Sequence, residues 1–96
     1  MPTFDLEFLP SARKEWDKLD KSIRNQFAKK LAECLAAPRI ASAKLSGMAD
    51  CYKIKLRAAG YRLVYRVEDK RVTVVVIAVG RRDRNAVYKA AAKRIE

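Results

Sequence analysis

The chain has 96 residues, of which 50% are hydrophobic, so it can form one domain (residues 1–96) with its own core but not two. It holds 22 lysines and arginines against 11 acids, a net charge of +11, which favours a polyanion such as a nucleic acid, although an acidic protein would fit the same field. Histidine is absent, which excludes histidine-based acid–base pairs, catalytic triads and histidine metal sites.

The first third of the chain predicts a strand followed by two helices. Residues 3–9 alternate apolar and acidic side chains, as a half-buried strand does. Pro10 suits the first position of a helix that runs to about Asp20. Ser22 is the expected N-cap of a second helix, which Pro38 ends. This helix carries an apolar stripe made of Ile23, Phe27, Leu31 and Leu35.

The remaining two thirds predict three strands and a last helix. The apolar run VTVVVIAV indicates a strand that is buried on both faces or central in the sheet. Gly60 supplies the permissive backbone angle of a hairpin turn. In chain order we expect a loop at 39–50, strands at 51–57 and 61–67, a turn at 68–71, a strand at 72–79 and a final helix capped by Asp83.

The element order β-α-α-β-β-β-α predicts an α+β fold. Alternating apolar residues give the hairpin strands one apolar face, so we expect an antiparallel twisted sheet with all helices packed on that face. Like charges that face each other across strands cost roughly 0.2–1 kcal/mol per pair, so a cationic opposite face indicates a functional surface. Its members are Lys53, Lys55, Arg57, Arg62 and Arg66.

Lysine, arginine and tyrosine are the residue types left for a functional site. Lys53 and Lys55 project from one strand face and Arg62 from the same face of the next strand, while GRRDRNAVY (80–88) adds three arginines and Tyr88. Such groups could clamp a phosphodiester, either as a binding surface or as an active site. RNA carries its own nucleophile, the 2′-hydroxyl, so an enzyme would have to supply only a base, charge stabilisation and an acid.

The remaining sequence signals concern location and cofactors. Cys34 and Cys51 are expected to be buried, reduced thiols, and neither a metal site nor a cofactor is predicted. The start of the chain lacks the pattern of a secretory signal, and its longest apolar stretch is too short to span a bilayer. We therefore expect a cytoplasmic protein without membrane contact.

Three stretches of the chain resemble the RelE family of bacterial toxins from toxin–antitoxin pairs: KEWDKL, APRIASAKLSGMADCYKIKLRAAGYRLVYRV and VGRRDRNAVYKAAAKRI. The resemblance runs nearly end to end. It implies a small α+β domain, with a curved antiparallel sheet backed by helices, that enters the A site of a translating ribosome and cuts mRNA there. It also implies a RelB-like antitoxin as partner, with operator DNA bound only by the toxin–antitoxin complex.

The family's functional positions fall on Lys53, Lys55, Arg62, Arg82 and Tyr88. The resemblance makes the two lysines candidates for activating the 2′-hydroxyl and balancing charge, and Arg62 a phosphate stabiliser. By the same resemblance, Arg82 is a charge stabiliser and candidate proton donor. Tyr88 is a residue that stacks or orients the RNA and takes part in proton transfer. Five further cations are expected to contact RNA or the ribosome: Lys44, Arg57, Arg66, Arg81 and Arg84.

Two other functions fit the same composition. The related ParE toxins bind DNA gyrase without catalysis on a similar scaffold, and they generally lack this set of lysines, arginines and tyrosine. A basic nucleic-acid-binding module would bind free RNA or DNA without cutting it, with a steep salt dependence.

Overall fold

The computed structural model describes residues 3–81 and 83–95, and it leaves the side chain of residue 84 undescribed. The predicted element order is confirmed by β1 (Asp5–Phe8), α1 (Pro10–Asp17), α2 (Lys21–Cys34), β2 (Cys51–Leu56), β3 (Tyr61–Glu68), β4 (Thr73–Arg81) and α3 (Ala86–Arg94). Short 3₁₀ turns lie between them: η1 (Ala41–Ala43), η2 (Asp69–Arg71) and η3 (Asp83–Asn85). No helix within 3–81 and 83–95 is both long and apolar enough to cross a membrane.

The four strands form one sheet in the order β1-β4-β3-β2. β4 is a central strand, and its residues from Thr73 to Val79 are buried, as the apolar run predicted. It runs antiparallel to β3 but parallel to β1, with Asp5 paired to Thr73. The sheet is therefore mixed, and the expectation of a wholly antiparallel sheet was wrong. The direction of β1 is set by a pairing far along the chain, which no local turn dictates.

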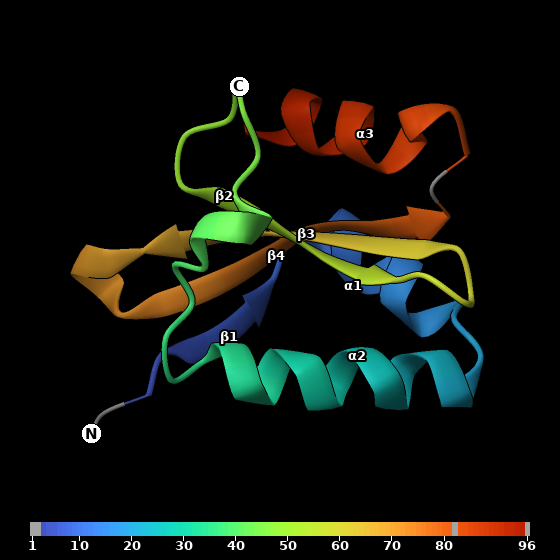
Figure 1. Ribbon diagram of the computed structural model, residues 1–96, viewed down its shortest axis with the longest axis horizontal. Coiled ribbons are helices and arrows are strands. Elements are labelled where there is room, and N and C mark those ends of the chain that lie inside the picture. The colour runs from blue at the N-terminus through green and yellow to red at the C-terminus, as the bar shows by residue number, and fades with distance from the viewer. Residues whose placement is uncertain (1–2, 82, 96) are drawn as a thin grey trace.

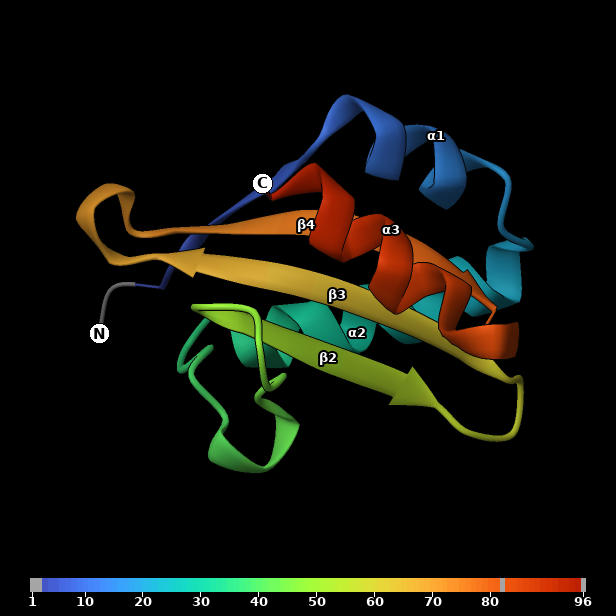
Figure 2. The same ribbon diagram turned by 90° about the horizontal axis from the view of Figure 1, so that it is seen from above.

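The helices cover both faces of the sheet, contrary to the prediction of one covered face. α2 lies below the sheet and α3 above it in Figure 1, and α1 lies beside β4 in Figure 2. The second face needs a cover because Cys51 and Val64 stand among its cations and β4 is apolar on both sides. The α3 residues Val87 and Ala91 pack against these groups in a second buried cluster.

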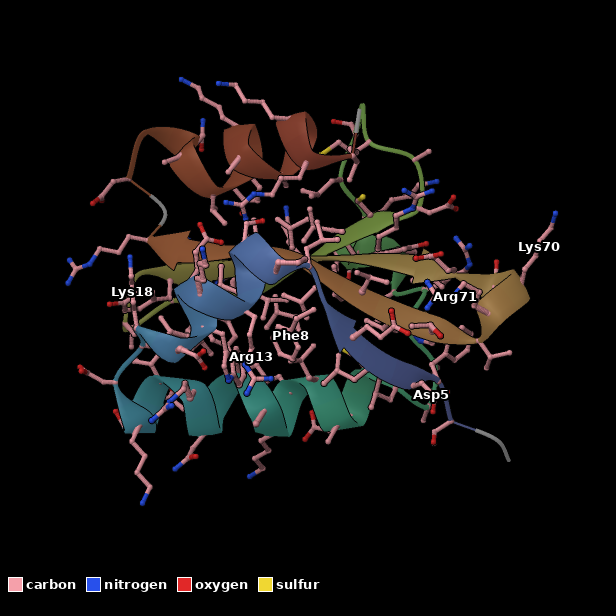
Figure 3. The ribbon with its side chains drawn as sticks, turned by 180° about the vertical axis from the view of Figure 1, so that it is seen from behind. Asp5, Phe8, Arg13, Lys18, Lys70 and Arg71 are labelled. Carbon is pink, nitrogen blue, oxygen red and sulfur yellow. The ribbon has the colours of Figure 1, made fainter. Side chains whose placement is uncertain are left out.

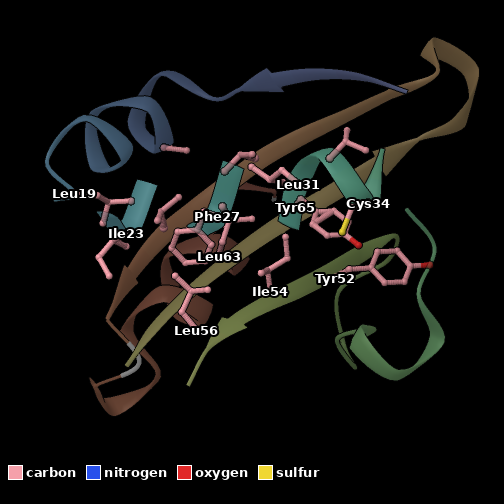
Figure 4. Close-up of a cluster of buried hydrophobic side chains, with 14 of the residues drawn as sticks. Leu19, Ile23, Phe27, Leu31, Cys34, Tyr52, Ile54, Leu56, Leu63 and Tyr65 are labelled. Atoms are coloured by element: carbon pink, nitrogen blue, oxygen red, sulfur yellow. The ribbon is translucent and has the colours of Figure 1, made fainter. Parts of the chain in front are cut away.

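The larger apolar cluster lies between the sheet and helices α1 and α2 (Figure 4). Trp16 of α1 packs against Phe8 of β1 and Phe27 of α2, with ring centroids 5.2 and 6.4 Å apart. Figure 3 shows Arg13 beside Phe8, and the guanidinium carbon lies 5.6 Å from the ring centre. These contacts fix α1 between β1 and α2.

The boundaries of α2 differ from the predicted ones. The predicted stripe is confirmed for Ile23, Phe27 and Leu31, but Cys34 is the fourth buried residue and Leu35 is only partly buried. Asp20, not Ser22, occupies the N-cap position, and no side chain caps the helix. The helix also ends at Cys34, ahead of Pro38, which disfavours helical backbone in the residue before it.

A β-bulge interrupts the pairing of β3 with β4. Val64 pairs with Ala78, whereas Tyr65 pairs with Val76, so Ile77 is the extra residue. Ile77 and Ala78 consequently both join the cluster beneath α3, and the alternation of β4 reverses beyond them. As a result Gly80 pairs with Arg62, and Arg81 pairs with Tyr61.

Tyr65 links the sheet to the chain that leaves α2. Its hydroxyl donates a 2.7 Å hydrogen bond to the Pro38 carbonyl, and its ring stacks on Tyr52 with centroids 5.6 Å apart. Burial raises the pKa of the Tyr65 hydroxyl above its ordinary value of 10.0. Burial likewise raises the pKa of the Cys34 and Cys51 thiols above 9.0. Both cysteines are buried and free, as predicted.

These three raised pKa values predict a loss of stability in alkali. The unfolded chain releases these protons from about pH 9 upward while the folded chain retains them, so the free energy of unfolding should be level near neutrality and fall above that pH. Urea unfolding between about pH 7 and pH 11 measures it. Tyr65→Phe should cost about 1–2 kcal/mol at neutral pH and fall less steeply above about pH 10. An equally steep fall in this variant would contradict the assignment to Tyr65.

Candidate active site

A hollow of about 430 Å³ lies between the β2–β3 hairpin, the loop that precedes β2 and the start of α3. Cationic side chains and one phenol dominate its lining, and none of the described residues in that lining is acidic. The structure thus brings together four of the predicted catalytic residues, while Arg82 lies outside the described residues. The lining consists of Leu45, Lys53, Lys55, Arg62, Asn85 and Tyr88.

The β2–β3 hairpin forms the floor of the hollow, and it places Lys53, Lys55 and Arg62 on one face, as predicted from the sequence. Lys55 pairs directly with Arg62, and Lys53 pairs with Val64 on the same face. Arg62 is only 6% exposed, and its Nη1 donates a 2.9 Å hydrogen bond to the carbonyl of Tyr61. This bond holds the guanidinium in place before any ligand arrives. A planar donor group fixed in this way is suited to bidentate contact with a phosphate.

The wall of the hollow is α3, which Val87 and Ala91 anchor to the sheet. Tyr88 is half-buried, so its ring packs against this second cluster and also lines the hollow. The expected cap Asp83 instead begins η3, and Asn85 takes the N-cap position with φ 57° and no capping side-chain bond. Asparagine tolerates this left-handed conformation better than most residues.

Sequence reasoning missed two lining residues, Leu45 and Asn85. The loop that holds Leu45 is placed by backbone pairing, because Lys44 bridges to Tyr52 and the Leu45 N–H donates to the Cys51 carbonyl at 3.0 Å. No sequence pattern in this loop predicts that backbone pairing. Asn85 did offer a signal, since asparagine is a preferred N-cap residue and also tolerates left-handed backbone.

The other predicted contact residues lie outside the hollow. Arg57 is exposed in the hairpin turn, and Arg66 is exposed at the far end of β3 beside Arg39. Arg81 lies over the Tyr61 ring, 5.5 Å from its centre, on the face opposite to Arg62. Lys44 is exposed beside the hollow, and the side chain of Arg84 is outside the description. Their contacts with RNA or the ribosome stay predictions.

Among the described residues four arginines form ion pairs, and none of these four lines the hollow: Arg13, Arg39, Arg71 and Arg94. Arg39 is the most connected, with Asp69 at 2.6 Å, Asp50 at 3.1 Å and the Tyr52 hydroxyl at 3.2 Å. The hydrogen bonds that Arg39 donates to the Asp69 carboxylate raise the pKa of Arg39. These acids therefore neutralise positive charge away from the hollow. In the part of the chain that the structure describes, no group of three or more acids or cysteines is placed to hold a metal.

Comparison with known proteins identifies the family. A family model described as the ParE toxin of type II toxin-antitoxin system, parDE, matches residues 6–86. The mRNA interferase toxin RelE of Escherichia coli strain K12 is 58% identical over 90 residues, which cover 94% of this chain and 95% of the relative. The chain belongs to the RelE family of type II toxins. A sequence identity of 58% over nearly the whole chain identifies the family more specifically than the ParE model does, because that model matches the wider scaffold.

Solved structures of RelE proteins confirm the fold. A free-state double arginine-to-alanine mutant of E. coli toxin RelE matches this RelE-family chain with a TM-score of 0.92 and 53% identity, covering 99% of this chain and 100% of that one. The toxin of the intact E. coli RelBE toxin–antitoxin complex matches with a TM-score of 0.81 and 55% identity, covering 83% and 98%. RelE toxins this similar have thus been seen both free and bound to antitoxin.

Proposed function

We propose that this RelE-family chain is a ribosome-dependent endoribonuclease that cuts mRNA in the A site and so stops translation. The hollow carries the proposal, because Lys53, Lys55, Arg62 and Tyr88 converge there. A binding module needs cations spread along a strand of nucleic acid. A hollow with a preset guanidinium and a phenol at its wall suits one phosphodiester.

The reaction that fits this set is a transesterification within the RNA. The 2′-oxygen attacks the adjacent phosphorus, the bond from phosphorus to the 5′-oxygen breaks, and the fragments carry a 2′,3′-cyclic phosphate and a 5′-hydroxyl. One proton must leave the 2′-hydroxyl and one must reach the departing 5′-oxygen. The pentavalent intermediate carries more negative charge than the resting phosphodiester. Fixed cations therefore stabilise it preferentially.

Each residue then has a candidate task. Lys53 and Lys55 lie next to the attacked phosphate, where they balance charge and can accept the 2′-hydroxyl proton. Arg62 holds the non-bridging oxygens through its fork of donors. Tyr88 offers its ring to a base of the codon, and its hydroxyl can move a proton. Arg82 belongs to the same set by family resemblance, as a charge stabiliser and candidate donor to the leaving oxygen.

Ribosomes stalled on a defined mRNA with an empty A site test the proposal. Added protein should cut within the A-site codon, and the downstream fragment should accept phosphate from polynucleotide kinase without prior phosphatase treatment, which reports a 5′-hydroxyl. The same mRNA without ribosomes is the control and should stay intact. Uncut mRNA on the ribosome would overturn the proposal. Cutting of free mRNA would show that cleavage does not depend on the ribosome.

The match to the ParE family model favours one alternative function, that of a toxin that binds DNA gyrase without catalysis. A gyrase supercoiling assay separates the two. The endoribonuclease proposal expects supercoiling to proceed at its normal rate in the presence of the protein, whereas inhibited supercoiling with intact mRNA would favour the rival.

The same proposal names the partners. We expect a RelB-like antitoxin to bind this chain and suppress cleavage, since RelE relatives have been solved in complex with RelB. Operator DNA should bind only the toxin–antitoxin complex, and the site of action should be the cytoplasm, where ribosomes translate. Adding antitoxin to the cleavage assay at equal concentration should abolish cutting.

A further inference from the structure

Glu15 of α1 and Arg94 of α3 form a half-buried pair beside the outer edge of β4. Arg94 donates to both carboxylate oxygens of Glu15, at 2.8 and 3.1 Å. Each partner also bonds to the backbone of β4: Glu15 accepts the Val79 N–H at 3.1 Å, and Arg94 donates to the Ile77 carbonyl at 2.8 Å. The side chains are only 33% and 23% exposed. We call these four hydrogen bonds the Glu15–Arg94 clamp.

The clamp lies where the sheet loses its neighbouring strand. β1 pairs with β4 only as far as Val76, and the Leu9 N–H closes that ladder by donating to the Val76 carbonyl at 3.0 Å. Beyond this point α1 runs along the edge of β4 in place of a strand (Figure 2). The Ile77 carbonyl and the Val79 N–H would have no strand partner at this edge, and the clamp supplies one to each.

The backbone groups that the clamp holds lie at the β-bulge and two residues beyond it. Ile77 is the extra residue, and the bulge decides that Gly80 pairs with Arg62. Arg94 is the last residue of α3, whose other end carries Tyr88 at the hollow. The same pair of side chains therefore holds the strand that pairs with the floor of the hollow and the helix that forms its wall.

We propose that the Glu15–Arg94 clamp is a positioning device for the RNA-cleavage site, setting Tyr88 against Arg62 and the two lysines. This inference rests on the function proposed above. Neither clamp residue lines the hollow, so both act through the elements that they hold.

The rest of the α3 contact explains why a clamp is needed. The helix has nine residues, too few for stability on its own, and Val87 and Ala91 are the residues of α3 that are buried. Contacts between small apolar side chains are non-directional, so they hold the helix on the sheet without fixing its rotation or its shift along its axis. A bidentate ion pair tied to the backbone at two points fixes both. Displacement of a reacting group by about 1 Å can cost about 100-fold in rate.

Steady-state cleavage on stalled ribosomes tests the clamp. Glu15→Ala should lower kcat about 10–100-fold, with KM for the ribosome changed less than about twofold, because binding surfaces stay in place while the reacting groups move. Glu15→Gln keeps an acceptor for Val79 and should recover part of the loss. Arg94→Lys keeps the charge but loses the fork and should resemble Glu15→Gln.

Two control variants separate positioning from general loss of stability. Asp17→Asn removes the exposed pair with Arg13, 3.2 Å long, from the same helix while leaving Arg13 on the Phe8 ring, and it should leave kcat unchanged. Phe27→Leu weakens the opposite cluster and serves as a stability match, chosen by its thermal midpoint. If Phe27→Leu lowers kcat as much as Glu15→Ala does at the same midpoint, the clamp has only a structural role and the inference fails.

Hydrogen exchange gives a readout that does not depend on cleavage. In Glu15→Ala the amides of α3 and those of residues 77–80 should exchange at least about 10-fold faster, while those of β2 keep their wild-type protection. Faster exchange with unchanged kcat overturns the positioning role, and unchanged exchange overturns the clamp itself. Failure of the wild-type protein to cut mRNA, with the exchange result intact, would instead overturn the proposed function.

Discussion

Replacing Arg62 by methionine is expected to slow mRNA cleavage on the ribosome by at least about 100-fold, the scale of losing one preorganised stabilising group. Arg62 lies in the floor of the hollow, paired with Lys55 across the hairpin, and its guanidinium is held by the Tyr61 carbonyl. Methionine keeps much of the volume and removes all the donors. Because those donors act mainly on the charged intermediate, the loss should fall on kcat more than on ribosome binding.

The same substitution should not reduce stability. Arg62 is a buried charge placed directly across from another cation, an arrangement that costs folding free energy. Loss of its hydrogen bond to Tyr61, worth about 1 kcal/mol, is offset by removing that charge from the interior. We expect Arg62→Met to unfold in urea at a free energy equal to or above that of the wild type. If the variant is at least as stable as the wild type but cuts mRNA much more slowly, Arg62 is retained for function and not for stability.

Arg57→Met is the matched control for Arg62→Met. It makes the same chemical change and the same change in net charge on the same hairpin, but at an exposed turn position outside the hollow. Because Arg57 is a predicted contact to RNA or the ribosome, its loss is expected to raise KM, while kcat should stay close to the wild-type value. Arg62→Lys adds a test of the fork, since it keeps the charge and should still lose most of the rate. Normal cleavage by Arg62→Met would remove Arg62 from the site.

Tyr88→Ala should slow cleavage by about 100-fold, because it deletes both the stacking surface and the hydroxyl at the wall of the hollow. Tyr88→Phe separates these contributions: it keeps the ring and removes the hydroxyl. If the ring alone orients the codon, Tyr88→Phe should retain most of the activity. If the hydroxyl moves a proton, Tyr88→Phe should lose nearly as much as Tyr88→Ala and should show an altered pH–rate profile.

Tyr61→Phe is the control for the hydroxyl deletion. Tyr61 is also partly buried on β3 but faces the other side of the sheet, where Arg81 covers its ring. It should leave both the rate and its pH profile unchanged. Hydrogen exchange in α3 should match the wild type in Tyr88→Phe, which shows that the helix stays docked. Wild-type cleavage by Tyr88→Ala would mean that Tyr88 only packs against the second cluster.

Much of the candidate site followed from local sequence. Period-two alternation and the turn at Gly60, where φ is 72°, are enough to place Lys53, Lys55 and Arg62 on one face. The catalytic roles came from resemblance to the RelE family, because spacing alone left binding and catalysis both open. Four of those five residues lie together, and Arg82 is outside the described residues.

Only the tertiary structure decided how the hairpin is completed into a hollow. The apolar run of β4 has no alternation from which the bulge at Ile77 could be read, and that bulge turns Arg81 away from Arg62. The parallel pairing of β1, the docking of α3 on the cationic face and the clamp between Glu15 and Arg94 join residues far apart in the chain. Periodicity reports which residues an element buries, whereas the partner that covers them is set by packing the whole chain at once.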